Sequence, residues 1–347
     1  MAIIRDDSAL QKDAQAEEEI LEQGLRPQTL SEFIGQSQLK KNLSIILGAA
    51  KKREEVAPHL LFYGPPGLGK TTLAGIIAKE MNGNLQITSG PAVEKAGDLA
   101  AIISNLKEGD ILFLDEIHRL RRPVEEILYS AMEDFCLDLV VGKGPGARSM
   151  RLKLPKFTLV AATTRLGNLS SPLRDRFGES FRMDFYTPEE LMTIIIANAK
   201  KLEISIDADA AKVLAKSSRG TPRIANRLLQ RMRDFAHMKH TNHISQSLCR
   251  HALEELGIDS VGLSEGDRRF LTTIATMFQG GPVGLSTIAA ATGEEKETIE
   301  DIREPFLLQV GFIARTPKGR TLTPAAYAHL GITAPTKNGA IKEQSLF

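Results

Sequence analysis

Short apolar runs alternate with helical patterns between residues 60 and 185 of the chain. The strand candidates among these runs are residues 60–63, 85–88, 111–114 and 158–162. Strands of a parallel sheet are apolar because helices cover both faces, and alternation with helices is typical of a domain built this way. We therefore predict an α/β domain with a parallel sheet, and a ligand site at the carboxyl ends of its strands.

A second pattern interrupts this region. Residues 137–141 and 148–154 are strand-like and flank a glycine-rich turn at residues 142–146. They predict a β-hairpin inserted before the strand at residue 158. Period-two alternation places Met150 and Leu152 on its apolar face. That face either packs on its own domain or docks a partner protein, and the pattern leaves both interpretations open.

A helix-start signal marks the end of the α/β region. Thr187 can cap a helix that has Pro188 in its first turn, and Glu190 completes a capping box. Helical patterning follows, and the chain is long enough for more than one core. The predicted units are a large α/β domain (residues 1–186, with the hairpin at about 136–155), a small helical domain (187–259), three helices with a two-stranded wing (260–335) and a disordered tail (336–347).

Composition and charge narrow the candidate functions. Lys and Arg number 44 and Asp and Glu 43, a net charge of +1, so only a local patch could attract nucleic acid or a membrane. Cys136 and Cys249 are too few for a disulfide framework, and we interpret them as apolar fillers in a reducing compartment. Because we find no secretory signal and no run of about 18 apolar residues, we expect a cytoplasmic protein without membrane partners.

Residues 64–71 read GPPGLGKT, a complete phosphate-binding loop between a strand candidate and a helix candidate. Its glycines let backbone N–H groups close around phosphate oxygens, and the helix N-terminus adds partial positive charge. We expect Lys70 to reach the β- and γ-phosphates and Thr71 to hold Mg²⁺ through its hydroxyl. The chain is therefore predicted to bind a nucleoside triphosphate.

Two strand ends carry the residue types that hydrolysis needs. Asp115 and Glu116 follow an apolar strand candidate, where Asp115 would complete the magnesium shell and Glu116 would polarise an attacking water. The strand at residue 158 ends in Thr163 and Thr164, and either could orient that water or sense the γ-phosphate. Together with the phosphate loop, these residues predict hydrolysis of the nucleoside triphosphate as well as binding.

Arginines are the remaining candidates for contact with the γ-phosphate. Arg174 and Arg176 lie on either side of Asp175, and either could neutralise charge in the transition state or form a surface ion pair. The residues alone do not choose between them. Arg223 opens a predicted helix of the small helical domain, where it could report the nucleotide state by moving that domain.

The ordered set of phosphate loop, acidic pair and arginines resembles the AAA+ ATPases, which combine an α/β P-loop domain with a small helical lid. Residues 25–27, 33–36, 115–120 and 173–178 are, more narrowly, similar to the RuvB family of bacterial Holliday junction motors. This resemblance covers residues 25 to about 330. It implies an ATP-driven DNA translocase and helicase of recombination and repair, using ATP and Mg²⁺ as a homohexameric ring. Its implied partners are the duplex DNA arms of a Holliday junction, the junction-recognising protein RuvA and, in a larger complex, the resolvase RuvC.

The resemblance also implies roles for individual residues. Its catalytic set is Lys70, Asp115, Glu116, Thr164, Arg176 and Arg223. Its ATP contacts within one subunit are Leu25, Arg26, Gly67, Lys70, Thr71, Thr72, Tyr186 and Arg223. Arg176, in preference to Arg174, would be an arginine finger on the neighbouring subunit's ATP, near Glu133, Asp134 and Phe135. Met150 and Leu152 of the hairpin would contact RuvA.

The C-terminal unit resembles a winged helix. Arg315, Lys318 and Arg320 cluster at its wing, and residues 305–342 contain no acid. Gly319 would let the backbone approach a phosphate. Such contacts position a protein on DNA without reading sequence and make binding salt-dependent, although a solvated turn is the alternative. The resemblance points to Arg315 and Arg320 as the phosphate contacts.

Other functions fit less well. Protein-threading unfoldases carry an aromatic pore loop, whereas residues 89–93 (SGPAV) contain no aromatic residue. Clamp-loader subunits share the ATPase core but lack such a wing. A nucleotide-switched DNA-binding regulator would bind ATP without sustained turnover, and Glu116 and Arg176 argue against it.

Overall fold

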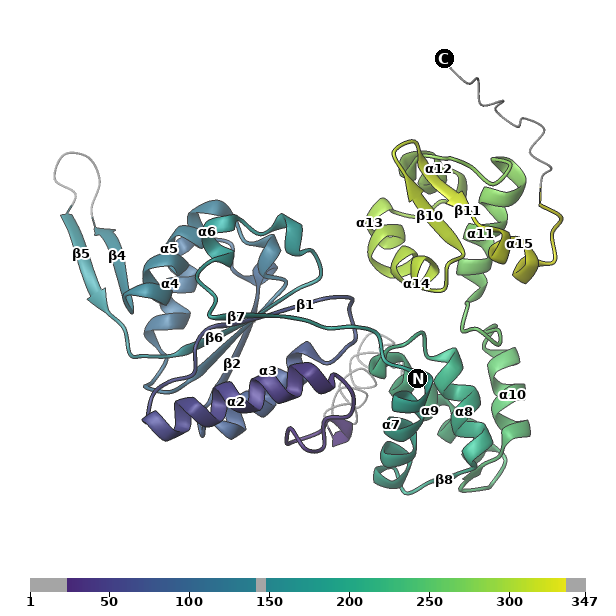
Figure 1. Cartoon of the computed structure of the whole chain (residues 1–347), viewed down its shortest axis with the longest axis horizontal. Helices are drawn as coiled ribbons and strands as arrows, with labels where there is room; N and C mark the ends of the chain where they lie inside the picture. Colours follow the sequence, from purple (N-terminus) through teal and green to yellow (C-terminus); the bar gives the residue numbers. More distant parts are fainter. Residues whose placement is uncertain (1–23, 142–147, 335–347) are drawn as a thin grey trace, which may run out of the picture. The chain divides into compact units, whose positions relative to one another are not determined.

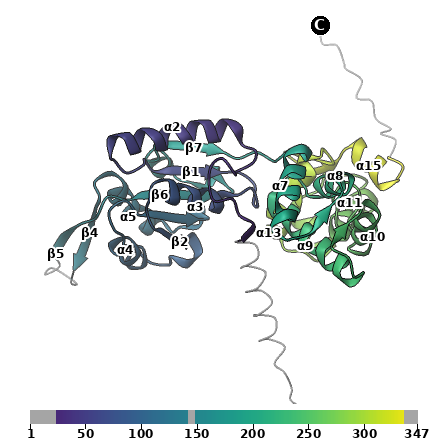
Figure 2. The ribbon, with the colours of Figure 1, turned by 90° about the horizontal axis from the view of Figure 1, so that it is seen from below.

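The computed structural model describes residues 24–141 and 148–334 (Figures 1 and 2). Contacts divide the chain into two compact units, with the boundary after Gln246. The expected turn at residues 142–146 and the expected tail at 336–347 lie outside the described residues. No helix of the described residues is long and apolar enough to cross a membrane.

A five-stranded parallel sheet forms the centre of the first unit. Its order is β2 (Leu85–Ser89), β3 (Ile111–Asp115), β6 (Thr158–Thr163), β1 (Leu60–Tyr63) and β7 (Glu179–Arg182). The four strands expected from the apolar runs are confirmed. The fifth, β7, was missed because its sequence, ESFR, contains a single apolar residue, Phe181, and so no apolar run.

Helices cover both faces of this sheet (Figure 1). On one face, α3 (Lys70–Glu80) packs against β3 and β6. A 2.6 Å salt bridge from Lys51 to Glu80 ties α3 to α2 (Ser37–Arg53). On the other face lie α4 (Ala96–Ser104) and α5 (Arg122–Glu133).

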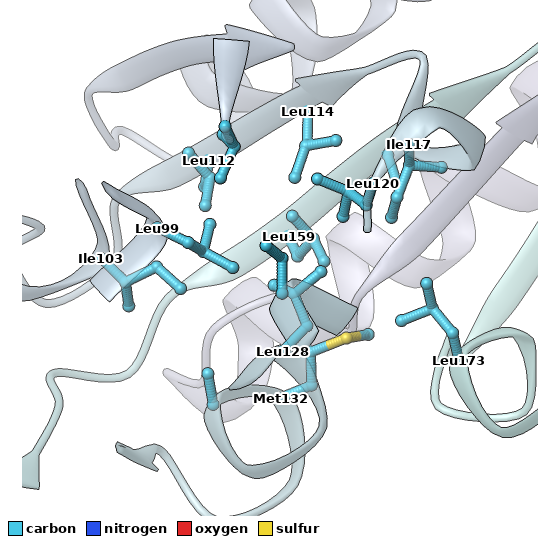
Figure 3. Close-up of a cluster of buried hydrophobic side chains, with 14 of the residues drawn as sticks. Leu99, Ile103, Leu112, Leu114, Ile117, Leu120, Leu128, Met132, Leu159 and Leu173 are labelled. Atoms are coloured by element: carbon cyan, nitrogen blue, oxygen red, sulfur yellow. The ribbon is translucent and has the colours of Figure 1, made fainter. Parts of the chain in front are cut away.

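The core between the sheet and α4 and α5 is built from interleaved leucines (Figure 3). Leu112 and Leu159 point from the strands towards Leu99 of α4 and Leu128 of α5, and all four are fully buried. Burial of one such side chain stabilises the fold by about 2 kcal/mol. This core holds the carboxyl ends of β3 and β6 in place.

The inserted hairpin is confirmed between α5 and β6. Strand β4 (Cys136–Val141) pairs antiparallel with β5 (Arg148–Lys153) in a sheet of their own. Leu154, at its base, is buried with the domain core, whereas Met150 is 50% and Leu152 37% exposed. The apolar face therefore packs on its own domain only at the base.

A helical region completes the first unit. Its elements are α7 (Pro188–Lys201), α8 (Ala208–Ser217), α9 (Pro222–Met238) and the parallel strand pair β8 (Ser205–Ile206) and β9 (His243–Ile244). The short helix α6 (Ser171–Arg174) belongs to the α/β domain, where it packs against α5 and buries Leu173 in the leucine core. The expected capping box at the start of α7 is present. Thr187 Oγ1 accepts from the Glu190 N–H at 3.2 Å, and the Glu190 carboxylate accepts from the Thr187 N–H at 2.9 Å.

The second unit contains the expected helices and wing. Its elements are α10 (Gln246–Glu255), α11 (Glu265–Met277), α12 (Leu285–Thr292), α13 (Lys296–Thr298), a π-helical turn (Ile299–Arg303), α14 (Glu304–Gln309), β10 (Ile313–Thr316), β11 (Gly319–Leu322) and α15 (Pro324–Leu330). Leu271, Ile274 and Leu307 are fully buried at its centre. The final helix, α15, was not expected.

Candidate active site

A cavity of about 570 Å³ lies in the first unit at the carboxyl ends of the strands, a size that suits a nucleotide. It is lined by the phosphate loop, a segment before α2, and residues of α7 and α9. The lining includes these residues singled out from the sequence: Leu25, Arg26, Gly67, Lys70, Thr71, Thr72, Asp115, Glu116, Thr164, Tyr186 and Arg223. The fold thus brings together side chains that are far apart along the chain.

Glycine backbone conformations shape the phosphate loop. Gly64 and Gly69 have backbone φ angles of +144° and +101°, which residues other than glycine rarely adopt. A Cβ at Gly64 would also lie 2.4 Å from the Met183 carbonyl oxygen. Helix α3 begins at Lys70, and the Gly69 cap position offers its first N–H groups no side-chain acceptor. This helix start is suited to an anion.

Lys70 lies inside the loop and is bound by it. Its Nζ donates to the carbonyl oxygens of Gly64 at 2.9 Å and Pro65 at 2.8 Å. Burial lowers the pKa of Lys70 to about 8, with Asp115 opposing and Arg223 reinforcing the shift. Phosphate oxygens would offer this ammonium a stronger, charged acceptor than the two carbonyls.

Two carboxylates stand at the end of β3. Asp115 Oδ1 accepts from the Glu116 N–H at 2.9 Å, which holds the side chain of this cavity-lining residue in place. Glu116 has a left-handed backbone (φ +48°), and its carboxylate pairs with Arg119 at 3.2 Å. Both carboxylates line the cavity, so a nucleotide and a water held there would lie within reach of them.

The structure distinguishes the two threonines at the end of β6. Thr163 is buried; its Oγ1 lies 3.0 Å from His118 Nδ1 and accepts from the Arg165 N–H at 3.0 Å. Thr164 lines the cavity. Thr164 is therefore the residue placed to meet a nucleotide, and His118 supports the strand end through Thr163.

Tyr186 connects the loop to the helical region. Its phenol donates to the Leu68 carbonyl oxygen at 3.1 Å, and its backbone N–H donates to Gly220 O at 2.9 Å. Burial raises the pKa of Tyr186, so the phenol stays protonated and keeps donating. Lys201 Nζ reaches the Leu25 carbonyl oxygen at 3.2 Å. These bonds connect the phosphate loop and the segment at Leu25 to the helical region.

Arg176 is not among the described residues that line its own subunit's cavity. Its guanidinium lies 4.5 Å from the Tyr129 ring centroid and donates to Pro172 O at 2.7 Å and to Glu133 Oε2 at 3.1 Å. Arg174 is exposed. The structure thus brings Arg176 and Glu133 together, and neither residue is among the described residues that line the cavity.

Asp134 and Phe135 follow Glu133 at the end of α5. Asp134 pairs with Arg151 of the hairpin at 2.7 Å. The Phe135 ring lies 5.9 Å from the Phe157 ring in a T-shaped arrangement. Neither is among the described residues that line the cavity, and the same holds for Arg176.

At the wing, Arg315 of β10 lies directly opposite Arg320 of β11. Both donate to the carboxylate of Glu304, and Lys318 at the turn is exposed. A Cβ at Gly319 would lie 2.3 Å from the Val283 carbonyl oxygen, so glycine allows β11 to approach its own domain. The approach of this backbone to a phosphate stays a prediction.

Models of three domain families match the chain in succession. The Holliday junction DNA helicase RuvB P-loop domain covers residues 25–183, the RuvB AAA lid domain 186–259 and the RuvB C-terminal winged helix domain 260–331. The chain belongs to the RuvB family. The predicted architecture of P-loop domain, helical lid and C-terminal winged helix is confirmed with it.

Solved structures of a RuvB from Thermotoga maritima are similar along nearly the whole length. One, described as the Holliday junction branch migration motor, is 50% identical with a TM-score of 0.82, and the match covers 90% of this chain and 100% of that one. A substituted form of the same protein is 50% identical with a TM-score of 0.84, covering 89% and 100%.

The cavity of this RuvB-family ATPase also contains residues that sequence reasoning missed. Ile194, Asn198 and Lys201 of α7 line it with Asn226 of α9. Asn198 is buried and donates to Asn226 Oδ1 at 2.7 Å. Asn198 shares the helix face of the apolar residues Leu191 and Ile195, so a polar residue in the apolar repeat of α7 was the available signal.

Proposed function

We propose that the chain is the ATP-driven motor that moves Holliday junctions by branch migration as a hexameric ring. Its membership of the RuvB family makes it a P-loop ATPase of branch migration. The observation that carries the ring is Arg176, whose contacts lie outside the described lining of its own cavity. A finger supplied by the neighbouring subunit makes hydrolysis depend on assembly.

Within one subunit we assign the chemistry to the cavity residues. Lys70 binds the β- and γ-phosphates, Glu116 polarises the attacking water and Thr164 orients it. Arg223, in the first turn of α9, contacts the γ-phosphate. When hydrolysis removes that phosphate, the lid to which α9 belongs loses the contact and moves. Arg119 pairs with Oε2 of Glu116, and the second carboxylate oxygen remains to accept a hydrogen bond from a water.

The same cavity contains donors that fit Mg²⁺. The Thr71 hydroxyl and the Asp115 carboxylate both line it, and oxygen ligands completed by phosphates and water are what Mg²⁺ prefers. We propose that these two residues hold the ion, which supplies charge neutralisation at the phosphates.

Two surfaces would connect the motor to its partners. The exposed Met150 and Leu152 support docking of the hairpin on RuvA, with RuvC joining in a larger complex. The exposed Arg315 and Lys318 support contact between the wing and phosphates of the duplex arms. Contacts of this type are independent of sequence, as a motor that moves through any DNA requires.

The test is the ATPase rate per subunit as a function of protein concentration, with and without duplex DNA. We expect cooperative dependence on concentration and stimulation by DNA. Lys70→Ala should abolish hydrolysis, and Arg315→Ala with Lys318→Ala should leave the basal rate but remove the stimulation. Hydrolysis that is independent of concentration and of DNA would contradict the ring motor.

A further inference from the structure

The wing contains a fully buried acid. Glu304, the first residue of α14, is 0% exposed, and its carboxylate accepts from Arg315 Nε at 2.8 Å and from Arg320 Nε at 2.6 Å. The two arginines are directly opposite each other across β10 and β11. Two guanidinium groups therefore share one carboxylate inside the winged helix.

The two arginines are held to different degrees. Arg320 is 15% exposed, and its backbone exchanges two hydrogen bonds with Val283, at 2.8 and 2.9 Å. It also reaches Glu300 at 3.4 Å. Arg315 is 52% exposed. Arg320 is thus anchored within the domain, whereas Arg315 presents much of its side chain to solvent.

Electrostatics explains why the carboxylate matters. Like charges directly opposite on paired strands repel each other. The negative charge of the Glu304 carboxylate, which lies between the two guanidinium groups, offsets part of that repulsion. A carboxylate this deeply buried needs its partners in turn, because an unpaired buried charge is strongly destabilising. The neighbouring Arg303 is not one of them, since it pairs with Glu294 and with Asp267, the latter at 3.1 Å.

We infer that Glu304 is a positioning residue for DNA binding: Arg320 fixes its carboxylate, and the carboxylate holds the exposed Arg315 in the orientation that meets a DNA phosphate. This inference rests on the proposed contact between wing and DNA. It adds an anchoring role to the phosphate contact that the resemblance implies for Arg320. Charge alone predicts the opposite, because removal of an acid should strengthen binding to a polyanion.

The experiment compares full-length Glu304→Gln with Glu297→Gln, the same charge change at an exposed site of α13. Each is made in the natural background and in Arg315→Ala, and affinity for a duplex DNA is measured across salt concentrations. We expect Glu304→Gln to weaken binding about tenfold and to reduce the salt slope by about one phosphate contact. Glu297→Gln should bind as well as the natural chain or better.

The Arg315→Ala background separates positioning from folding. We expect Glu304→Gln to have little further effect there, because the residue that it positions is absent. Unchanged or tighter binding in the natural background would overturn the inference, as would an equal loss in both backgrounds, which would indicate general destabilisation. If Arg315→Ala alone leaves binding unchanged, the proposed wing contact fails as well. If only Glu304→Gln is without effect, the proposed function stands and the inference fails.

Discussion

His59 shows how one residue joins several elements of the ATPase domain. Its Nδ1 accepts from the Leu159 N–H of β6 at 2.8 Å, and its Nε2 lies 3.1 Å from the Met132 carbonyl oxygen of α5. Because Nδ1 accepts, the ring is neutral with its proton on Nε2. Burial lowers the pKa of His59 from 6.5, with the Met132 bond opposing.

This geometry predicts a pH dependence of stability. The unfolded chain takes up a proton on His59 below about pH 6.5, whereas the folded chain resists it, so stability falls as pH falls below that value. The loss from this group is at most about 1.4 kcal/mol per pH unit. Urea unfolding of the natural chain and of His59→Asn, at pH 7.5 and 5.5, measures it. An equal pH dependence in both proteins would contradict the assignment.

At the scale of single residues, contiguous motifs were readable from the sequence and spatial ones were not. The roles of Lys70 and Asp115 follow from the phosphate loop and the strand end that contain them. The pairing of Glu304 with two arginines joins residues 11 and 16 positions apart, and no local pattern signals it. The residues alone left Thr163 and Thr164 equal, the resemblance favoured Thr164, and of the two only Thr164 lines the cavity.

Among the elements, the hairpin carries the clearest functional prediction. Its base is buried in the domain core through Leu154, but Met150 and Leu152 remain exposed. Two exposed apolar side chains on a projecting hairpin present a small apolar surface, typical of a contact for a partner.

We expect Met150→Ser with Leu152→Ser to weaken binding of RuvA at least about tenfold, because the apolar contact area is lost. The basal ATPase rate should stay unchanged, since neither residue lines the cavity. Calorimetric titration with purified RuvA measures the change. Ile45→Ser is the matched control, because Ile45 is 61% exposed on α2 and should leave RuvA binding intact. Full binding by the hairpin variant would exclude this surface.

Most elements could be predicted from local patterns, and the exceptions share a cause. The capping box of α7 and the four apolar strands carry their signals in consecutive residues. Strand β7 does not, because three of its four residues are polar and only Phe181 is apolar. Its position beside β1 is set by pairing between residues more than a hundred positions apart along the chain.

At the scale of the whole molecule, the division of catalytic residues between subunits is the central proposal. Lys70 and Glu116 line the cavity of one subunit, whereas Arg176 would act on its neighbour. A subunit with an intact cavity and no finger should therefore be rescued by a subunit with the reverse defect.

Mixed rings test this division. Arg176→Ala should bind ATP without hydrolysing it, and Lys70→Ala should do neither. With random assembly of equal amounts, about a quarter of the interfaces join an intact cavity to an intact finger, so the mixture should regain ATPase activity. Arg176→Ala mixed with the Lys70→Ala, Arg176→Ala double variant is the control and should stay inactive. No gain over the separate proteins would refute a finger acting between subunits.

The sequence by itself determined the α/β class, the hairpin, the phosphate loop with its acidic partners and the resemblance to a family of motors. Each of these rests on residues that are neighbours in the chain or that repeat at the period of a strand or helix. The tertiary structure alone decided which threonine faces the cavity, where Arg176 points and what Glu304 binds. These depend on contacts between distant segments, and packing brings such segments together only when the whole domain has folded.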